Sequence, residues 1–409
     1  MSDSSVETNA GTSSCWQQFR EVFLIFLRLG LTSFGGPVAH LGYFREEFVE
    51  RRRWLSDRSY ADLVALCQFL PGPASSQVGL GLGMSRAGYA GAAAAWLGFT
   101  LPSALVLIAL ALSITSLGES FPMGALQGLK VVAVAVVAQA VWGMGNSLCV
   151  GKLKVSLMAL AAAVVLLLPS VLTPVLVIIL AGLVGLWKIT PDARDPEDFL
   201  PIKTSRTHAK RWLIAFFVLL AGLPLLAAIT NNPALNLFDA FYRAGALVFG
   251  GGHVVLPLLQ SEVVVTGWVE NDAFLAGYGA AQAVPGPLFT FAAFLGTAAE
   301  GDTVFAGGLL GGLFCLVVIF LPSFLLIAGA LPYWEQLRSD ARLQAALAGV
   351  NAAVVGILLA ALYNPVWTSA VHSAADFVMV LLALIALMVW KLPAWLVVLG
   401  SGVIGWIVF

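Results

Sequence analysis

The sequence predicts an all-α polytopic membrane protein built from two homologous halves. The scarcity of charge, the length of the apolar runs and an internal repeat predict it. Charged residues make up 11% of the 409-residue chain and hydrophobic residues 60%, whereas a soluble domain carries about 25% charged residues to solvate its surface. The chain therefore has too little charge to be surrounded by water, which favours a lipid environment.

The apolar runs have the length that a bilayer requires. About 20 apolar residues in a helix cross about 30 Å of hydrocarbon, and near-continuous runs of Leu, Val, Ile, Ala and Phe cover 173–187, 211–229 and 374–390. About 13 hydrophobic segments are predicted, and those with internal Gly and Pro are expected to include broken or re-entrant helices. They cover residues 16–38, 62–83, 88–114, 126–148, 155–168, 173–187, 212–229, 238–259, 273–298, 304–330, 344–364, 376–390 and 393–409.

Blocks of sequence recur in the same order in the two parts of the chain, which predicts a duplication. LRLGLTSFGGP at 27–37 matches YRAGALVFGGG at 242–252 with an offset of 215, and QFLPGP at 68–73 matches QAVPGP at 282–287 with an offset of 214. FTLPS at 99–103 is similar to IFLPS at 319–323, and GLK at 128–130 falls opposite GVN at 349–351.

The repeat and the segments together predict the organisation of the chain. We expect a disordered tail (1–15), a first transporter repeat (16–187), a cytoplasmic linker with an extra helix (188–237) and a second repeat (238–409). Seven segments separate the corresponding starts, and an odd number of crossings gives the copies opposite orientations. The prediction is therefore a pair of inverted-topology repeats.

The distribution of Lys and Arg predicts the orientation in a bacterial-type inner (plasma) membrane. Twelve lie in loops after even-numbered segments, so that side is expected to be cytoplasmic together with the N-terminus. The opposite side holds five, which are an exception to the rule: Arg45, Arg51, Arg52, Arg53 and Arg58. They alternate with Glu46, Glu47, Glu50 and Asp57, so we expect an interfacial helix whose charges largely cancel.

Composition argues against several other classes of protein. The net charge of −1 gives no basic surface for nucleic acid. The four cysteines are scattered, and neither they nor the His and carboxylate residues have metal-ligand spacing. The sequence contains no phosphate-binding loop, dinucleotide fingerprint or catalytic-triad signal, so we expect neither a cofactor nor an enzyme.

Two interruptions occur in each half at the depth of the membrane. The first consists of Phe34, Gly35, Gly36 and Pro37, matched by Phe249, Gly250, Gly251 and Gly252. The second consists of Pro71, Gly72 and Pro73, matched by Pro285, Gly286 and Pro287. Irregular backbone inside a bilayer survives only around a protein-lined cavity, so these motifs are expected to break helices beside a binding site. The alternative for each Pro-Gly-Pro is a kinked packing helix.

A helix that starts after such a turn presents unpaired N–H groups to anions. Ser75, Ser76 and Gln77 follow the first Pro-Gly-Pro and Thr290 follows the second, and we expect them to donate to a bound oxyanion. Gln68 and Gln282 precede the two turns and are expected to orient them.

The charged candidates occupy matched positions. Arg28 and Arg243 each lie six residues before a Phe-Gly-Gly and are predicted to be anion ligands or an ion-pair gate, with snorkelling to the interface as the alternative. Lys130 falls opposite Asn351, which suggests one substrate site with unequal halves, unless Lys130 is a solvated helix end. Glu47 and Glu262, 215 residues apart, are proton-coupling candidates, with a solvated interfacial role as the alternative. His40 and His253, near the two glycine breaks, are expected to be structural hydrogen-bonding residues.

These paired motifs resemble the chromate ion transporter family in its long, two-domain form. The resemblance is carried by FGGPVAHLGYFREEFV (34–49), QFLPGP with its following Ser-Ser-Gln, FGGGHVVLPLLQSEVV (249–264) and QAVPGP. It covers nearly the whole chain apart from 1–15 and 188–211. One departure is Gly252, where the first copy has Pro37, so the second break is expected to bend less sharply.

The resemblance implies a secondary transporter that exports chromate and confers chromate resistance. It also implies that a proton gradient drives transport and that sulfate competes with chromate. Chromate and sulfate are tetrahedral dianions, for which Arg, helix-start N–H groups and hydroxyls are suitable donors. The alternatives are a transporter of sulfate or another oxyanion, and a passive anion channel. A homodimer is compatible with the large apolar surface.

Overall fold

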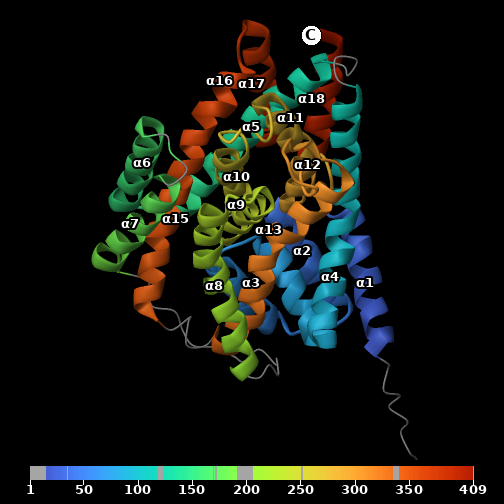
Figure 1. Ribbon diagram of the computed structural model, residues 1–409, viewed down its shortest axis with the longest axis vertical. Helices are drawn as coiled ribbons and strands as arrows, with labels where there is room; N and C mark the ends of the chain where they lie inside the picture. The colour runs from blue at the N-terminus through green and yellow to red at the C-terminus, as the bar shows by residue number, and fades with distance from the viewer. Residues whose placement is uncertain are drawn as a thin grey trace, which may run out of the picture.

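The computed structural model describes residues 15–34, 36–117, 123–168, 170, 173–190, 206–249, 252–334 and 340–408. In these ranges the chain forms helices and short connections and no strand, as predicted (Figure 1). The predicted tail, apart from Cys15, lies outside the described residues, as do Gly35, Gly250 and Gly251 among the helix-breaking residues.

The first half contains α1 (Cys15–Thr32), α2 (Gly36–Arg45), a π-helical turn η1 (Glu46–Arg51), α3 (Asp57–Phe69), α4 (Ala74–Leu117), α5 (Met123–Leu148), α6 (Lys152–Leu167) and α7 (Thr173–Lys188). The second half follows α8 (Arg206–Thr230) and contains α9 (Pro233–Ala246), η3 (Gly252–Val254), α10 (Val255–Val263), α11 (Asn271–Ala281), η4 (Leu288–Thr290), α12 (Phe291–Ala298), α13 (Gly308–Ala330), η5 (Leu331–Tyr333), α15 (Ala341–Ala361), η6 (Leu362–Trp367), α16 (Thr368–Ala370), α17 (Ala374–Met388) and α18 (Ala394–Val408).

The helices have the length and surface of a multi-pass integral membrane protein. Five helical stretches of the described chain are long and apolar enough to cross a bilayer: Ala74–Ser116, Gly124–Leu148, Thr207–Thr230, Gly308–Tyr333 and Ala341–Ala370. On α8, Ile214, Phe217 and Leu225 are 61%, 61% and 65% exposed. Contiguous apolar surface of this kind is rare on soluble monomers and is what lipid requires.

All four predicted interruptions end a helix. The first-half breaks separate α1 from α2 and α3 from α4, and the second-half breaks separate α9 from α10 and α11 from α12. Gly36, Gly72 and Gly286 have φ of +76°, +124° and +99°, values that side chains disfavour and glycine adopts freely. The predicted segments 16–38, 238–259 and 273–298 are therefore pairs of short helices and not single spans.

The long helix α4 reverses its direction at Gly88. A straight helix of its 44 residues would be about 66 Å long, twice the hydrocarbon thickness, but Ala87 and Gly88 leave the helical conformation. A Cβ on Gly83 would lie 2.2 Å from the carbonyl oxygen of Gly91, which a straight helix could not bring so close. The reversal falls at the predicted boundary between the segments 62–83 and 88–114.

The first-half breaks return the chain to the end from which it started. Glu21, near the start of α1, lies 3.6 Å from Arg52, which follows η1, and 3.2 Å from Arg86, which precedes the reversal in α4. Nearby, the Trp212 indole N–H at the start of α8 donates to the Tyr89 hydroxyl at 3.0 Å. We call this the basic end of the molecule; α1, α2 and α3 occupy the lower half of Figure 1.

The predicted placement of the five arginines opposite Arg86 is therefore wrong. Segment 16–38 does not cross the protein, because the break after α1 turns the chain back through α2. The predicted cancellation of charge is visible in part, since Arg45 contacts Glu50 and Asp57, and both Arg51 and Arg52 contact Glu47.

The loops 264–270 and 299–307 lie at the other end of α13. They contain Glu270, Glu300 and Asp302 and no Lys or Arg, so we call this the acidic end. A Cβ on Gly329 would lie 3.1 Å from the backbone nitrogen of Leu213, which fixes the last turn of α13 at the basic end. The 23 residues of α13 extend roughly 35 Å from there. They begin after the loop 299–307, where the Glu300 N–H donates to the Trp268 carbonyl at 2.8 Å. The loops 264–270 and 299–307 thus meet at the acidic end.

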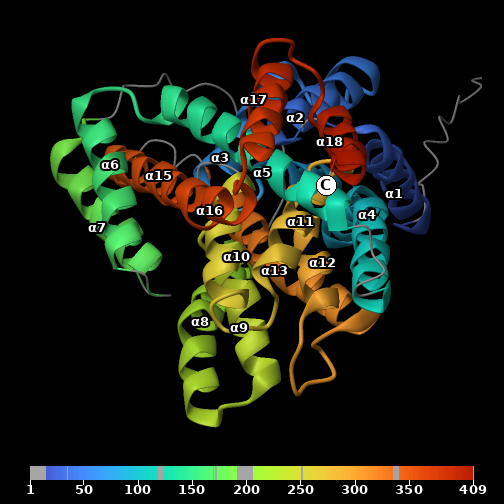
Figure 2. The same ribbon diagram turned by 90° about the horizontal axis from the view of Figure 1, so that it is seen from above.

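The last helices of each half pack on the other half. On α5, a Cβ at Gly128 would lie 2.2 Å from the carbonyl oxygen of Ser401 in α18, so the two backbones touch. On α15, a Cβ at Gly349 would lie 2.1 Å from the carbonyl oxygen of Ala181 in α7. Figure 2 shows α6 and α7 beside α15, and α17 and α18 beside α5. Each half thus packs its last two helices against a helix of the other half, and glycines at equivalent places allow the close approach.

Candidate functional site

The helix breaks of the two halves are joined to each other by reciprocal backbone hydrogen bonds. The Gly72 N–H donates to the Val248 carbonyl at 2.6 Å, and the Gly286 N–H donates to the Ser33 carbonyl at 3.0 Å. Ser33 and Val248 immediately precede the two Phe-Gly-Gly motifs, so each Pro-Gly-Pro turn is bound to the glycine break of the opposite half. We call this meeting point the crossover site.

A serine from each long helix closes the crossover site. An ideal Cβ on Gly72 would lie 2.6 Å from the Ser323 hydroxyl of α13, and one on Gly286 would lie 3.0 Å from the Ser103 hydroxyl of α4. Both serines are fully buried and end the recurring Leu-Pro-Ser blocks. Sequence reasoning noticed these blocks only as evidence of the repeat, although a hydroxyl recurring inside two apolar helices was a signal that could have identified them.

Polar groups at and beside the crossover site are buried without a partner from the protein. In the described part of the chain, the buried side-chain atoms with no such partner include Ser33 Oγ, Ser76 Oγ, Gln77 Oε1, Thr100 Oγ1, Gln282 Nε2 and Ser323 Oγ. Nearly all buried polar atoms in native proteins are hydrogen-bonded. These hydroxyl and amide groups are therefore available to hydrogen-bond with water or with a polar solute.

His40 ties α2 to this region. Its Nε2 lies 3.2 Å from the Ser33 carbonyl oxygen and its Nδ1 lies 3.3 Å from Ser75 Oγ. The ring is 1% exposed. The Ser33 carbonyl also accepts from the Gly286 N–H, so His40 contacts the same oxygen atom that accepts the crossover bond. In the second half, His253 Nδ1 lies 2.8 Å from the Tyr278 hydroxyl, and both histidines have the structural hydrogen-bonding geometry that was predicted.

The predicted polar donors have unequal positions. Ser75, Ser76 and Gln77 lie buried in the first turn of α4, as expected. The Gln77 amide donates to the Pro71 carbonyl at 2.7 Å and so holds the first turn, a role predicted for Gln68, which instead is exposed on α3.

In the second half the predicted donors also differ in availability. The Thr290 hydroxyl donates to the Pro287 carbonyl at 2.7 Å and is already used within its own turn. Gln282 is half-buried with a buried, unpartnered amide nitrogen. The amide of Gln282 is therefore the available donor on this side.

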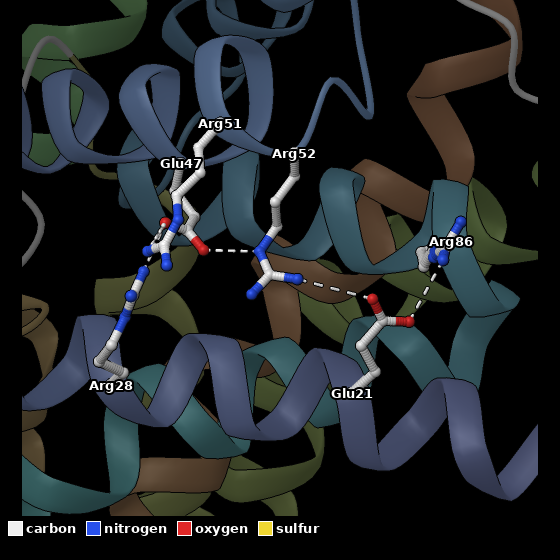
Figure 3. A network of polar contacts seen from close by, with 6 residues as sticks. All are labelled: Glu21, Arg28, Glu47, Arg51, Arg52 and Arg86. Carbon is white, nitrogen blue, oxygen red and sulfur yellow. Dashed lines mark hydrogen bonds and ion pairs between the residues drawn. The ribbon is translucent and has the colours of Figure 1, made fainter.

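Arg28 lies outside the crossover site, in a network at the basic end. Figure 3 shows its guanidinium on Glu47, whose other neighbours are Arg51 at 3.3 Å and Arg52 at 2.6 Å. The Glu47 side chain is 5% exposed, whereas that of Arg28 is 46% exposed. Arg28 precedes Ser33 by five residues on α1, so it lies between the basic end and the first helix break.

Arg243 repeats this ion pair in the second half with different neighbours. Its Nη2 lies 3.1 Å from Glu262, at the same 19-residue separation as Arg28 and Glu47, and 2.7 Å from Asp239. The three side chains are 17%, 11% and 9% exposed respectively. Both predicted arginines thus form ion pairs with the two predicted carboxylates, an arrangement that fits an ion-pair gate more closely than a free anion ligand.

Lys130 and Asn351 differ in their surroundings, as their chemistry does. The Lys130 ammonium lies 3.0 Å from Asp272 in the first turn of α11, and so links the two halves. Its side chain is 11% exposed and that of Asp272 is 64% exposed. Asn351 is half-buried on α15.

Fold and site together define the class of protein. Helices interrupted inside a membrane bundle, with their broken ends meeting around buried polar groups, are the architecture of membrane transport proteins. Within the described ranges, no group of three or more His, Cys, Asp or Glu side chains could hold a metal ion.

Comparison with known proteins gives the family. The chromate transporter family model matches residues 20–186 and 235–406. The chain is 30% identical to a chromate transport protein of Pseudomonas aeruginosa, covering 96% of this chain and 92% of that protein. It is 29% identical to a probable chromate transport protein of Synechococcus elongatus, covering 93% and 94%, and 28% identical to a chromate transport protein of Cupriavidus metallidurans, covering 95% and 93%. The chain belongs to the chromate transporter family, whose membership supports chromate transport. No solved structure matches it.

Proposed function

We propose that this protein is a secondary transporter that exports chromate from the cytoplasm across the inner membrane, driven by the proton gradient, and thereby confers chromate resistance. The observation that carries the proposal is the crossover site, where Ser33, Ser76 and Ser323 present buried hydroxyl groups that the protein leaves unpaired. A bound oxyanion would satisfy such groups.

The two halves are proposed to be inverted-topology repeats, over residues 16–187 and 238–409. The reciprocal bonds from Gly72 to Val248 and from Gly286 to Ser33 support this, because a two-fold relation generates contacts in such pairs. The opposite starting points of α1 and α9 support it too, since α1 starts at the basic end and α9 follows the far end of α8. Rocking one half against the other would then open the site to each side alternately.

The chemistry of the site suits a tetrahedral dianion. The Ser76 hydroxyl and the first backbone N–H groups of α4 can bind two or more of its oxygens, and the helix dipole favours negative charge there. Sulfate has the same charge and shape, so we expect it to compete. Donor geometry alone does not separate the two anions; cavity size and desolvation decide selectivity.

The arginine network is proposed to collect anions from the cytoplasm. It holds four arginines (Arg28, Arg51, Arg52 and Arg86) and two glutamates (Glu21 and Glu47), an excess of positive charge that raises the local anion concentration. At the opposite end, residues 260–272 and 299–307 contain no Lys or Arg. By the positive-inside rule we expect the basic end and the N-terminus to lie in the cytoplasm. Anions would then be captured from the cytoplasm, which supports export as the direction of transport.

The ion pairs are proposed to act as gates on either side of the crossover site. Opening the pair of Arg28 and Glu47 frees a guanidinium to meet the anion, and the pair of Arg243 and Glu262 does the same on the exit side. Lys130 contacts Asp272 and so links the halves in the state that the structure shows, and Asn351 occupies the matching position without charge in the second half.

Chromate flux into proteoliposomes of the purified chain, with and without an imposed pH gradient, tests the proposal. Gradient-dependent flux that a modest excess of sulfate lowers only weakly is the expected result. Flux that follows the chromate gradient alone after the pH gradient is collapsed would establish a passive channel. Sulfate flux that ignores chromate would establish a sulfate carrier, and no flux of either anion would overturn the proposal.

A further inference from the structure

Arg243 lies between two buried carboxylates. Its Nη2 contacts Asp239 Oδ2 at 2.7 Å and Glu262 Oε2 at 3.1 Å, so both oxygens are bound to one nitrogen atom. One guanidinium carries one positive charge, and two ionised carboxylates carry two negative charges. If both were ionised, the group would hold an uncompensated negative charge away from water, which is costly.

The first half is the internal control for this arrangement. The position that corresponds to Asp239 at the offset of 215 is Leu24, so no carboxylate lies one helical turn before Arg28 on α1. Glu47 instead faces Arg28, Arg51 and Arg52. The two matched ion pairs therefore have opposite charge imbalances, and only the Arg243 pair can be neutralised by taking up a proton.

No other described group supplies the missing charge. The elements that pack most closely against α9 and α10 are α8, α13, α15 and η3. In the described residues, Arg243 is the one cationic side chain that forms an ion pair with Asp239 or Glu262. Arg243 Nε is itself buried without a partner. The arginine thus has a free donor that a different arrangement of its neighbours could use.

We propose that Asp239 and Glu262 share one exchangeable proton, and that this pair is where proton movement is coupled to the anion. The step is a protonation: a carboxylate oxygen binds a proton and becomes a neutral carboxyl group. Protonation weakens the ion pairs that the two carboxylates make with Arg243. Arg243 lies five residues before Val248, whose carbonyl accepts the crossover bond just after the end of α9. This inference rests on the proposed function, since it assigns the residues of its coupling step.

Two transport assays on the full-length protein in proteoliposomes separate the inference from the proposed function. Chromate counterflow, the exchange of labelled for unlabelled chromate, requires no net proton movement, whereas flux driven by a pH gradient does. We expect Asp239→Asn to keep counterflow within about two-fold and to lose at least ten-fold in its response to the gradient. Asp302→Asn, an exposed carboxylate at the same end, should change neither assay.

A gradient response in Asp239→Asn and in Glu262→Gln equal to that of the unaltered protein would overturn the inference. The absence of chromate counterflow in the unaltered protein would instead overturn the proposed function. If Asp239→Asn fails to insert, infrared titration of the unaltered protein in lipid decides the matter. A buried carboxyl band that persists at neutral pH and disappears in Glu262→Gln supports the shared proton, and no such band contradicts it.

Discussion

Single hydroxyl groups carry much of the case for a binding site. Ser323 is fully buried beside Gly72 and Gln77, and its oxygen has no partner from the protein. A buried serine whose hydroxyl is unpaired contributes nothing favourable to stability, because burial without a hydrogen bond costs free energy. Its retention inside an apolar helix is explained if the hydroxyl serves a ligand.

We expect Ser323→Ala to lower chromate flux at least ten-fold without lowering thermal stability in detergent. The matched control is Ser113→Ala, because Ser113 is half-buried and its hydroxyl donates at 2.8 Å to the Ala109 carbonyl of its own helix. Flux and melting temperature measured on the same preparations check this. A variant with lowered stability and unchanged flux would show that the hydroxyl is structural.

At the scale of elements, the glycines of the Pro-Gly-Pro turns hold two halves together. Gly72 combines a φ of +124°, a hydrogen bond across the halves and no room for a side chain. A Cβ there would lie 2.6 Å from both Gln77 Nε2 and the Ser323 hydroxyl. Backbone conformation and close approach therefore both require glycine at this position.

Gly72→Ala should destabilise the protein by about 1–3 kcal/mol from backbone strain alone and abolish chromate flux, because the displaced turn breaks the crossover bond. The control is Gly143→Ala on α5, where an added Cβ meets nothing within 4 Å and alanine favours the helix. Denaturation in detergent and flux in proteoliposomes are the measurements. Full activity in Gly72→Ala would mean that the turn does not contribute to the site.

At the scale of the whole molecule, charge is distributed between two opposite ends. The network that joins Glu21, Arg52 and Arg86 gathers positive charge at one end. The Trp268 and Glu300 loops at the other end hold carboxylates without Lys or Arg. Such an asymmetry orients a membrane protein through the positive-inside rule.

Labelling of introduced cysteines checks this orientation. In a variant lacking the four native cysteines, Glu46→Cys and Asp302→Cys each place one exposed thiol at the basic or the acidic end. An impermeant maleimide added to intact spheroplasts should label Asp302→Cys at once and Glu46→Cys only after permeabilisation. The opposite pattern would reverse the orientation, and with it the proposed direction of transport.

Sequence reasoning predicted the motifs that meet in the structure, but not all of the side chains that lie beside them. It predicted the breaks and the polar residues Ser76 and Gln77 at the start of α4. It singled out two arginines and two glutamates but did not predict that each arginine contacts a glutamate. It assigned the hold on the first turn to Gln68 when the amide of Gln77 provides it. It also missed Asp239, because a carboxylate one helical turn before an arginine has no counterpart at Leu24 and so produced no repeat signal.

Hydrophobicity, proline and glycine act locally on the chain, so the membrane environment, the helical class and the positions at which helices end can be predicted from the residues alone. Tertiary structure decided which end each loop occupies and which residues meet. Arg52 and Arg86 both contact Glu21 because the chain folds back after α1, and the Ser33 carbonyl accepts from the Gly286 N–H although 253 residues separate them. Contacts of that kind depend on the direction in which the chain leaves each break. Glycine and proline allow the chain to turn there, but they do not specify the direction.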